Sequence, residues 1–323
     1  MADDKVEPSA GLPRNKIGPK IAEFFLVLMD IIKVVLLGGP VMFRTVLNIL
    51  RPRKLKNVSG QLALITGGAN GLGREMALLL ADHGCNIVIV DIDLKSAEKT
   101  CDDLRKKRVS AHAYQVDVSS FKDVETLAAK INGDIGPVDI LINNAGLIHF
   151  TFLQNSSVDE VNKLIDVNVK SYIWVTKIFL SEMMERKQGH IVAISSICGI
   201  YPHPWAVMYT TTKHAVNGFM GALREQLRLQ GYGRQIRTTC VSPYYISTRK
   251  DVTDFLQEPR FELLTTEYSA RVIVDGILRN EPTVAVPPFL DLGIRLMQIF
   301  PVKIQQLVRD IVVKEHDLHS VKA

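Results

Sequence analysis

Short apolar runs alternate with amphipathic stretches along most of the chain. The runs have the composition of strands buried on both faces, and they are Gln61–Thr66, Asn86–Asp91, Ala111–Asp117, Val138–Asn143, His190–Ser196 and Ile236–Ser242. Stretches with apolar residues at helical spacing lie between them, at Arg74–His83, Val124–Ile131 and Tyr209–Leu229. This alternation predicts an α/β fold in which a doubly wound parallel sheet carries helices on both faces.

The pattern changes at both ends of the chain. An interrupted apolar stretch runs from Ile21 to about Leu50, and a second one follows Pro287-Pro288 and is broken by Pro301. We therefore expect three parts: an N-terminal membrane anchor with a basic linker (1–56), a single catalytic domain (57–285) and an amphipathic cap (286–323). Two short helices are expected in the cap, which either contacts a membrane or packs on the domain.

The N-terminal apolar stretch is marginal as a membrane-spanning helix. A span needs about 20 apolar residues, and Phe24–Phe43 has this length but contains Asp30, Lys33 and Gly38-Gly39-Pro40. Two central charges cost about 5–7 kcal/mol, whereas the large apolar side chains return about 4–9 kcal/mol.

The helical phase of its polar residues favours a helix in the membrane surface. On a helical wheel the polar residues fall within about 140° of one another; they are Lys20, Glu23, Asp30, Lys33 and Arg44. We predict an amphipathic helix or a hairpin bent at Gly38-Gly39-Pro40, with the basic cluster Arg51–Lys56 on anionic head groups. The alternative is an extra helix packed on the catalytic domain.

The distribution of charge argues against a nucleic-acid-binding protein. The formal charge is +5 among 323 residues, of which 47% are hydrophobic and 23% charged. Residues 1–56 hold 10 basic and 5 acidic side chains, while residues 57–323 hold 29 of each. Nucleic-acid binders carry their basic excess on the folded body, so the neutral body suits uncharged substrates.

A glycine-rich turn follows the first predicted strand. Thr66–Gly73 reads Thr-Gly-Gly-Ala-Asn-Gly-Leu-Gly, with a strand before it and a helix after it. Gly67, Gly71 and Gly73 permit a tight turn and the close approach of a pyrophosphate, and the helix N-terminus offers free N–H groups. This strand–turn–helix context predicts a dinucleotide site.

The acid at the end of the second strand selects the cofactor. Asp91 lies 18 residues after Gly73, where its carboxylate can accept hydrogen bonds from both hydroxyls of an adenine ribose. It would repel a 2′-phosphate, and Asn70 offers no compensating charge. The sequence therefore favours NAD over NADP.

A tyrosine and a lysine are spaced one helical turn apart after the fifth strand. Tyr209 and Lys213 form an i,i+4 pair at the start of a predicted helix. In a chain of this composition, chance alone would give about 0.5 Tyr–Lys pairs at this spacing. The pair is therefore informative only together with the strand-end serines Ser195 and Ser196 and the other motifs.

The ordered set of motifs resembles the short-chain dehydrogenase/reductase family. The matching motifs span roughly residues 59–285, in the family's order and spacing; they are Thr66–Gly73, Asn143–Gly146, Asn168, Ser196 and Tyr209-x-x-x-Lys213. The resemblance implies a Rossmann-type fold and an NAD-dependent alcohol dehydrogenase.

The resemblance also implies the role of each site residue. Tyr209 would be the general acid/base, Lys213 would lower the pKa of Tyr209 and hold the nicotinamide ribose, and Ser196 would hydrogen-bond the substrate oxygen. Asn168 would hold a water that links Lys213 to solvent. The cofactor-binding residues would be Thr66, Gly67, Asn70, Gly71, Leu72, Gly73, Asp91, Asp117, Val118, Asn144, Ala145, Gly146, Tyr209, Lys213, Pro243, Ile246 and Thr248.

One departure from the family points to a branch within it. Tyr244 follows Pro243 where many members have glycine. Together with the N-terminal apolar segment and Arg51-Pro-Arg-Lys54, this resembles the branch that includes epidermal retinol dehydrogenase and lipid-droplet 17β-hydroxysteroid dehydrogenases. The resemblance implies a homodimer at the endoplasmic reticulum membrane and/or lipid droplet, with the catalytic domain facing the cytosol.

The expected substrate is a lipophilic alcohol or ketone of the retinoid or steroid class. We expect a pocket near Tyr209 that is lined by apolar residues: Leu147, Ile200, Tyr201, Trp205 and Met208. Thr248–Thr265 is expected to be a substrate lid. The alternatives are a reductase of fatty aldehydes or keto-lipids and a non-catalytic lipid-droplet scaffold protein.

The cysteines and histidines do not indicate a metal site. Cys85, Cys101, Cys198 and Cys240 form no CxxC pair, and no His/Cys cluster has metal-ligand spacing. We expect free thiols in a reducing compartment.

Overall fold

The computed structural model describes residues 24–33, 36–40, 43, 53–247 and 262–312. It separates into two compact units, Met1–Lys54 and Leu55–Ala323. In the first unit, residues 24–33 and 36–40 are helical, and Lys33 Nζ lies 3.2 Å from Asp30 Oδ1. Among the described residues, no helix has the combined length and apolar character needed to cross a bilayer.

The second unit is built on one parallel sheet of seven strands in the order β3-β2-β1-β4-β5-β6-β7. The strands are β1 (Leu62–Thr66), β2 (Asn86–Asp91), β3 (Ala111–Gln115), β4 (Ile140–Asn143), β5 (Gly189–Ile194), β6 (Ile236–Pro243) and β7 (Thr283–Val286). The predicted Rossmann-type parallel sheet is confirmed, and β2 has the bounds expected from the sequence.

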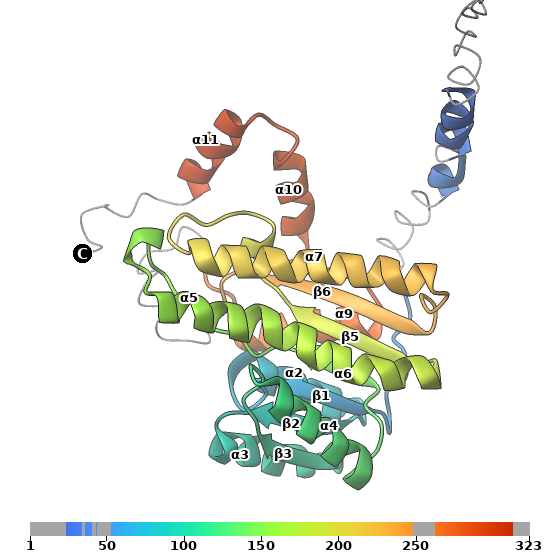
Figure 1. The fold of residues 1–323 in the computed structure, drawn as a ribbon, viewed down its shortest axis with the longest axis vertical. Helices are drawn as coiled ribbons and strands as arrows, with labels where there is room; N and C mark the ends of the chain where they lie inside the picture. Colours follow the sequence, from blue (N-terminus) through green and yellow to red (C-terminus); the bar gives the residue numbers. More distant parts are fainter. Residues whose placement is uncertain (1–23, 34–35, 41–42, 44–52, 248–261, 313–323) are drawn as a thin grey trace, which may run out of the picture. The chain divides into compact units, whose positions relative to one another are not determined.

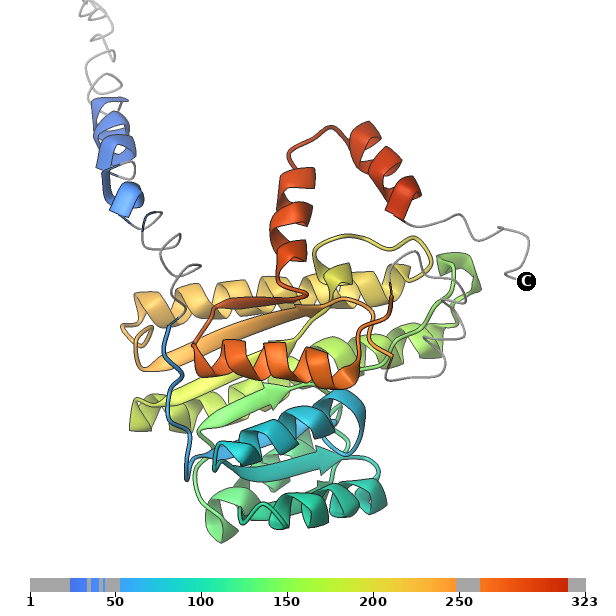
Figure 2. The ribbon, with the colours of Figure 1, turned by 180° about the vertical axis from the view of Figure 1, so that it is seen from behind.

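Helices cover both faces of the sheet (Figures 1 and 2). One face carries α2 (Gly71–Asp82), α3 (Leu94–Arg105) and α9 (Thr266–Leu278). The other carries α4 (Phe121–Asp134), α6 (Ser171–Arg186) and α7 (Val207–Leu229). The remaining helices are α5 (Val158–Ile165), which leads into α6 through a π-helical turn at Asp166–Lys170, α10 (Phe289–Met297) and α11 (Val302–Val312).

The two layers of helices explain why the central strands are largely apolar. Successive side chains of a strand point to opposite faces of the sheet. In β1, Ala63 and Ile65 therefore pack in one core, and Leu62 and Leu64 pack in the other. Both cores exclude water, so no position in the strand favours a polar residue.

The strand order reverses next to β1, and this reversal locates the site. The chain moves outward from β1 through β2 to β3 and then returns to place β4 on the other side of β1. The connections leaving the carboxyl ends of β1 and β4 therefore diverge to opposite faces. Ligands of open α/β sheets bind in the crevice that such a divergence leaves.

Candidate active site

The glycine-rich turn between β1 and α2 packs directly against the end of β4. A Cβ on Gly67 would lie 2.8 Å from Ala145 Cα, and Gly67 has φ +63°. A Cβ on Gly73 would collide with Gly67 O and lie 2.7 Å from Asn144 Nδ2. Only glycine therefore fits these two positions.

Thr66 and Asn144 join the turn to β4 by hydrogen bonds. Asn144 Nδ2 donates to Thr66 O at 3.0 Å and to Gly67 O at 2.9 Å. Thr66 Oγ1 accepts from Asn144 N at 3.0 Å and from Ala145 N at 3.1 Å. Thr66 thus acts by fixing the backbone of the turn, since its own side chain is buried below the site.

The predicted cofactor residues line a cleft of about 710 Å³ beside this turn. Those that line it are Gly67, Asn70, Gly71, Leu72, Gly73, Asp91, Asp117, Val118, Asn144, Ala145 and Gly146. Asn70 precedes α2 and makes no capping hydrogen bond with its side chain. The first N–H groups of α2 are therefore available to an anion, as a pyrophosphate requires.

Asp91 is held at the edge of the cleft by two backbone amides. Its Oδ2 accepts a hydrogen bond from Ala69 N, and its Oδ1 accepts one from Asp93 N, both at 3.1 Å. The ionisable residues that line the cleft are Asp91, Asp117, Asp159, Asp166 and Lys163. This excess of carboxylates gives a surface that disfavours an additional phosphate group.

The fit at Gly73 gives a testable prediction. Gly73→Ala should lower NAD affinity at least about tenfold, because the new methyl group would displace Gly67 or Asn144 from the turn. Titration calorimetry with NAD measures the change. Gly218→Ala is the matched control: a Cβ there meets nothing within 4 Å, and alanine stabilises a helix interior by about 1 kcal/mol. Equal NAD affinity in both variants would contradict the prediction.

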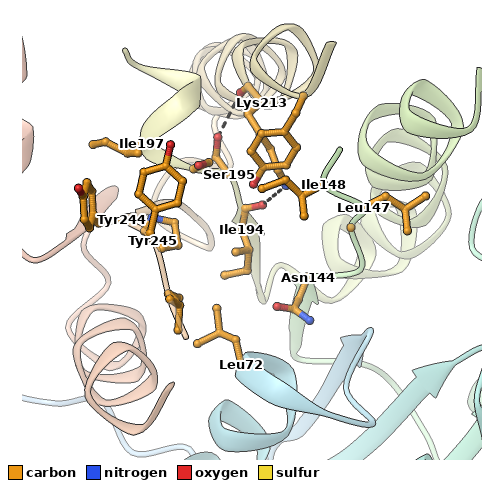
Figure 3. Close-up of a pocket in the computed structure, with 15 residues that line it drawn as sticks. Leu72, Asn144, Leu147, Ile148, Ile194, Ser195, Ile197, Lys213, Tyr244 and Tyr245 are labelled. Atoms are coloured by element: carbon orange, nitrogen blue, oxygen red, sulfur yellow. Dashed lines mark hydrogen bonds between the residues drawn. The ribbon is translucent and has the colours of Figure 1, made fainter. Parts of the chain in front are cut away.

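A second cavity of about 160 Å³ adjoins the cleft (Figure 3). The two share four lining residues, Leu72, Asn144, Gly146 and Leu147. The other residues that line the second cavity are Ile148, Ile194, Ser195, Ser196, Ile197, Tyr209, Lys213, Pro243, Tyr244, Tyr245 and Ile246. The strand ends of β5 and β6 and the first turn of α7 therefore meet at one small, largely apolar space.

Lys213 is buried at the base of this cavity. Its Nζ donates a hydrogen bond to Ile194 O at 2.9 Å, and the Tyr172 hydroxyl donates to the same oxygen at 2.9 Å. Burial away from water disfavours the ammonium and lowers the pKa of Lys213 to about 8. The Nζ atom lies 5.6 Å from the centroid of the Tyr209 ring.

The two serines after β5 have different partners. The Ser195 hydroxyl donates to Lys213 O at 3.1 Å, which ties β5 to α7. Ser196 Oγ accepts a hydrogen bond from Cys198 N at 3.1 Å at the start of the next short turn. The Ser195 proton is therefore engaged by the backbone, whereas Ser196 accepts from a backbone amide and its side chain also interacts with the Cys198 thiol.

Asn168 lies in the π-helical turn between α5 and α6, fully buried. Its Oδ1 accepts from Leu147 N, and its Nδ2 donates to Leu147 O, both at 2.8 Å, and to Thr212 Oγ1 at 3.1 Å. Asn168 Oδ1 and Lys213 Nζ lie 3.4 and 3.6 Å from the position where Gly146 would carry a Cβ. Both polar groups thus face the same small space above Gly146.

Several lining residues were not anticipated from the sequence. One wall of the cleft comes from α5 and the turn after it, through Asp159, Asn162, Lys163, Asp166 and Val167. Ile148, Ile194, Ile197 and Tyr245 were also missed. Ser119 and Ile92 also line the cleft. Each is adjacent in the sequence to a predicted cofactor residue, and this adjacency is the only feature of the sequence that could have indicated them.

The candidate apolar pocket was only partly right. Leu147 lines the cavity, but Ile200 lines a separate cavity of about 310 Å³ beside β7. Trp205 approaches the site through His203, whose ring centroid is 5.3 Å from that of Trp205 and 5.9 Å from that of Tyr245. Thr248 and most of the expected lid lie outside the described residues.

Comparison with known proteins decides the family. The family described as short chain dehydrogenase matches residues 61–258. The chain belongs to this family. Family membership confirms the dehydrogenase class and the nicotinamide cofactor that the motifs indicated.

This short-chain dehydrogenase is similar to curated steroid dehydrogenases over most of its length. It is 33% identical over 253 residues to 17-beta-hydroxysteroid dehydrogenase 13 of Homo sapiens, covering 77% of this chain and 82% of the relative. It is 31% identical over 285 residues to estradiol 17-beta-dehydrogenase 11 of Mus musculus, covering 87% and 94%. These relatives lie in the branch that the sequence resembles.

A solved structure shares the fold of this short-chain dehydrogenase. A short chain dehydrogenase/reductase from Burkholderia phymatum, in complex with NAD, matches with a TM-score of 0.69 at 23% identity. The match covers 77% of this chain and 96% of that chain.

Proposed function

We propose that the chain is a membrane-associated oxidoreductase that transfers a hydride between NAD and a lipophilic alcohol or ketone of the retinoid or steroid class. The observation that carries this proposal is that Ser196, Tyr209 and Lys213 line one cavity that is continuous with the dinucleotide cleft. The names of the steroid dehydrogenase relatives support the substrate class.

In this proposal Tyr209 exchanges a proton with the substrate oxygen. A free tyrosine has a pKa of about 10, so acting near pH 7 requires a stabilisation of the phenolate of about 4 kcal/mol. The Lys213 ammonium, on the same face of α7, supplies positive charge beside the ring. Ser196 donates a hydrogen bond to the same substrate oxygen and stabilises the developing alkoxide.

Asn168 and Lys213 form the start of a proton path. The amide of Asn168 is locked to Leu147 and Thr212, so its orientation is fixed. A water held above Gly146 would lie within reach of Asn168 Oδ1 and Lys213 Nζ. In alcohol oxidation Tyr209 takes up the hydroxyl proton of the substrate. Lys213 would take this proton from Tyr209 and release one of its own protons to that water, so that it remains an ammonium.

The residues of the cleft fit a dinucleotide. The turn that admits only glycine at Gly67 and Gly73 permits close approach of a pyrophosphate to α2, and Asp91 is placed for the adenine ribose. In this proposal Asp117 and Val118, which line the cleft, would contact the adenine, and Pro243 and Ile246, which line the adjoining cavity, would contact the nicotinamide. NAD, when bound, would accept the hydride from the carbinol carbon.

The surroundings of the cavity favour an uncharged, lipophilic substrate. Leu147, Ile148 and Ile197 give its walls an apolar character, and residues 57–323 are formally neutral. The N-terminal segment 1–56, with its exposed apolar residues such as Phe24 and Leu36, is proposed to hold the enzyme at a membrane. We place it at the endoplasmic reticulum membrane and/or lipid droplet, facing the cytosol, as a homodimer.

The proposed role of Asp91 gives a second prediction. Asp91→Asn should raise the ratio of NADP to NAD efficiency by about tenfold or more, because it removes the charge that repels a 2′-phosphate. The measurement is kcat/KM for both cofactors with one alcohol. Asp102→Asn, the same substitution at an exposed position of α3 that does not line the cleft, is the control. An unchanged ratio in the Asp91 variant would show that the ribose lies elsewhere.

A substrate panel tests the proposed function. Membrane-bound enzyme is offered retinol, estradiol, androgens and long-chain alcohols with NAD, and the matching ketones and aldehydes with NADH. We expect turnover of at least one retinoid or steroid. Turnover limited to long-chain aldehydes would select the reductase alternative, and no turnover of any compound would favour the scaffold alternative and contradict the proposal.

A further inference from the structure

Two helices at the C-terminal end present an apolar surface outside the core. We define the apolar ridge as eight exposed side chains of α10, α11 and the connection between them: Phe289, Leu292, Leu296, Ile299, Phe300, Val302, Ile304 and Leu307. Their exposed fractions range from 40% to 78%. No residue of α10 is buried.

The ridge follows the periodicity of its helices. Phe289, Leu292 and Leu296 are spaced at i, i+3 and i+7 on one side of α10, and Ile299 and Phe300 extend this side into the connection. Figure 1 shows α10 and α11 projecting from the body beyond α7. A helix whose apolar side faces outward requires an apolar partner, because isolated exposed patches of this kind are rare on soluble monomers.

The helices of the ridge are attached to the segment that follows Ser196. Gln298 Nε2 donates to Ile200 O at 2.8 Å, and the Tyr201 hydroxyl donates to Gln305 O at 3.1 Å. Ile200 follows directly on the short turn Ile197–Gly199, which Ser196 caps. The ridge is therefore coupled to the wall of the catalytic cavity.

We propose that the apolar ridge is a lipid-docking surface, which lies in a membrane or droplet surface and places the catalytic cavity beside it. Charge complementarity favours lipid as the occupant. Residues 289–312 contain three basic and two acidic residues. Asp291 is paired with Arg295 at 2.8 Å, whereas Lys303 is an exposed cation beside the ridge and suits anionic head groups.

This inference deepens the proposed function and rests on it in one respect, namely that the substrate is a lipophilic alcohol. A lipophilic alcohol is concentrated in the lipid phase, so a docked cavity would receive substrate without its crossing water. The lipid contact itself requires no turnover, and the first test below therefore reads the contact without using activity.

Hydrogen exchange of the full-length chain tests the contact. Exchange is compared in buffer, with phosphatidylcholine vesicles and with phosphatidylcholine–phosphatidylserine vesicles. We expect amides of 289–307 to slow at least about tenfold on vesicles, more strongly with phosphatidylserine, while the end of α7 around Leu229 is unaffected. Unchanged exchange in the ridge of vesicle-bound protein would overturn the proposal.

Variants of the ridge test whether lipid docking delivers substrate to the catalytic cavity. Leu292→Asp combined with Leu296→Asp should lower kcat/KM at least about tenfold for an alcohol dissolved in vesicles, and by less than about twofold for a short water-soluble alcohol. Leu229→Asp is the matched control, since Leu229 is 74% exposed on a different helix. A similar loss with both alcohols would overturn the proposal.

A second copy of the chain is the competing occupant. Mass measurement in solution without lipid distinguishes it: a dimer that dissociates on introducing Leu292→Asp and Leu296→Asp would show that the ridge binds another copy and would overturn the lipid assignment. If exchange slows on vesicles but no alcohol in the panel is oxidised, the lipid surface stands and only the proposed activity fails.

Discussion

Replacing Tyr209 by phenylalanine is expected to lower kcat at least about a thousandfold. The phenol is the group proposed to exchange a proton with the substrate oxygen, and general acid–base catalysis contributes about 10²–10⁴-fold. The ring would remain in place beside Lys213, so the change removes one hydroxyl and little packing. The measurement is single-substrate kinetics with the best alcohol of the panel.

Two controls separate chemistry from structure in this experiment. NAD affinity of Tyr209→Phe should stay within about threefold of the parent, because Tyr209 does not line the cleft, which is formed by the start of α2, the ends of the first four strands and α5 with the turn after it. Tyr232→Phe, three residues beyond the C-terminal end of α7, removes an equivalent hydroxyl outside both cavities and should retain activity. If Tyr209→Phe retains a tenth of the parental kcat, Tyr209 is not the proton donor.

Replacing Lys213 by methionine is expected to lower kcat/KM at pH 7 at least about a hundredfold. Methionine fills a similar volume but removes the positive charge beside Tyr209 and the hydrogen bond to Ile194 O. Without that charge the Tyr209 phenolate loses the stabilisation proposed for it. The kcat/KM of the variant should then continue to increase with pH at pH values where the kcat/KM of the parent has stopped increasing.

The pKa of Lys213 also predicts the alkaline limb of the pH profile. Because burial lowers this pKa to about 8, the ammonium is present below pH 8 and is lost above it. The kcat/KM for alcohol oxidation should therefore fall above about pH 8. Lys213→Arg keeps the charge at all accessible pH values, so its profile should show no fall near pH 8, whatever its absolute rate. A fall at the same pH in both proteins would assign the limb to another group.

The sequence predicted the sheet because both faces of it are covered. A strand between two helix layers is apolar in its interior, as in Ile87–Val90 of β2, and polar residues at both ends mark its bounds. The ends of β3 and β5 were overestimated, since Val116 and Ser195 continue an apolar or small-residue pattern after the ladder has ended. Side-chain pattern does not reveal where hydrogen bonding between strands stops.

The catalytic motif could be predicted from the sequence, but the hydrogen bonds that position it could not. Tyr209 and Lys213 share a helix face, so their proximity follows from helix geometry. The shared acceptor Ile194 O, which receives hydrogen bonds from Lys213 and Tyr172, depends on packing across the sheet. No local pattern encodes such a meeting of residues from β5, α6 and α7.

The wall of the cleft formed by α5 shows a different limit. Asn162, Lys163 and Asp166 have the composition of a solvent-exposed helix face, and a polar face that borders a ligand cleft looks the same in sequence. The C-terminal helices were predicted from their periodicity, but the same periodicity fits a packed cap and a membrane contact. The exposure of residues such as Phe289 and Ile299, which the sequence does not reveal, is the observation on which the proposed lipid contact rests.

Transfer of deuterium from substrate to cofactor tests the central claim most directly. The membrane-bound enzyme is incubated with NAD and retinol or estradiol carrying deuterium on the carbinol carbon, and the reduced cofactor is analysed by mass spectrometry. The account predicts deuterium in the NADH formed by the parent and in that formed by Tyr232→Phe, and almost none with Tyr209→Phe. Absence of label with the parent on both alcohols, or equal labelling by Tyr209→Phe, would contradict it.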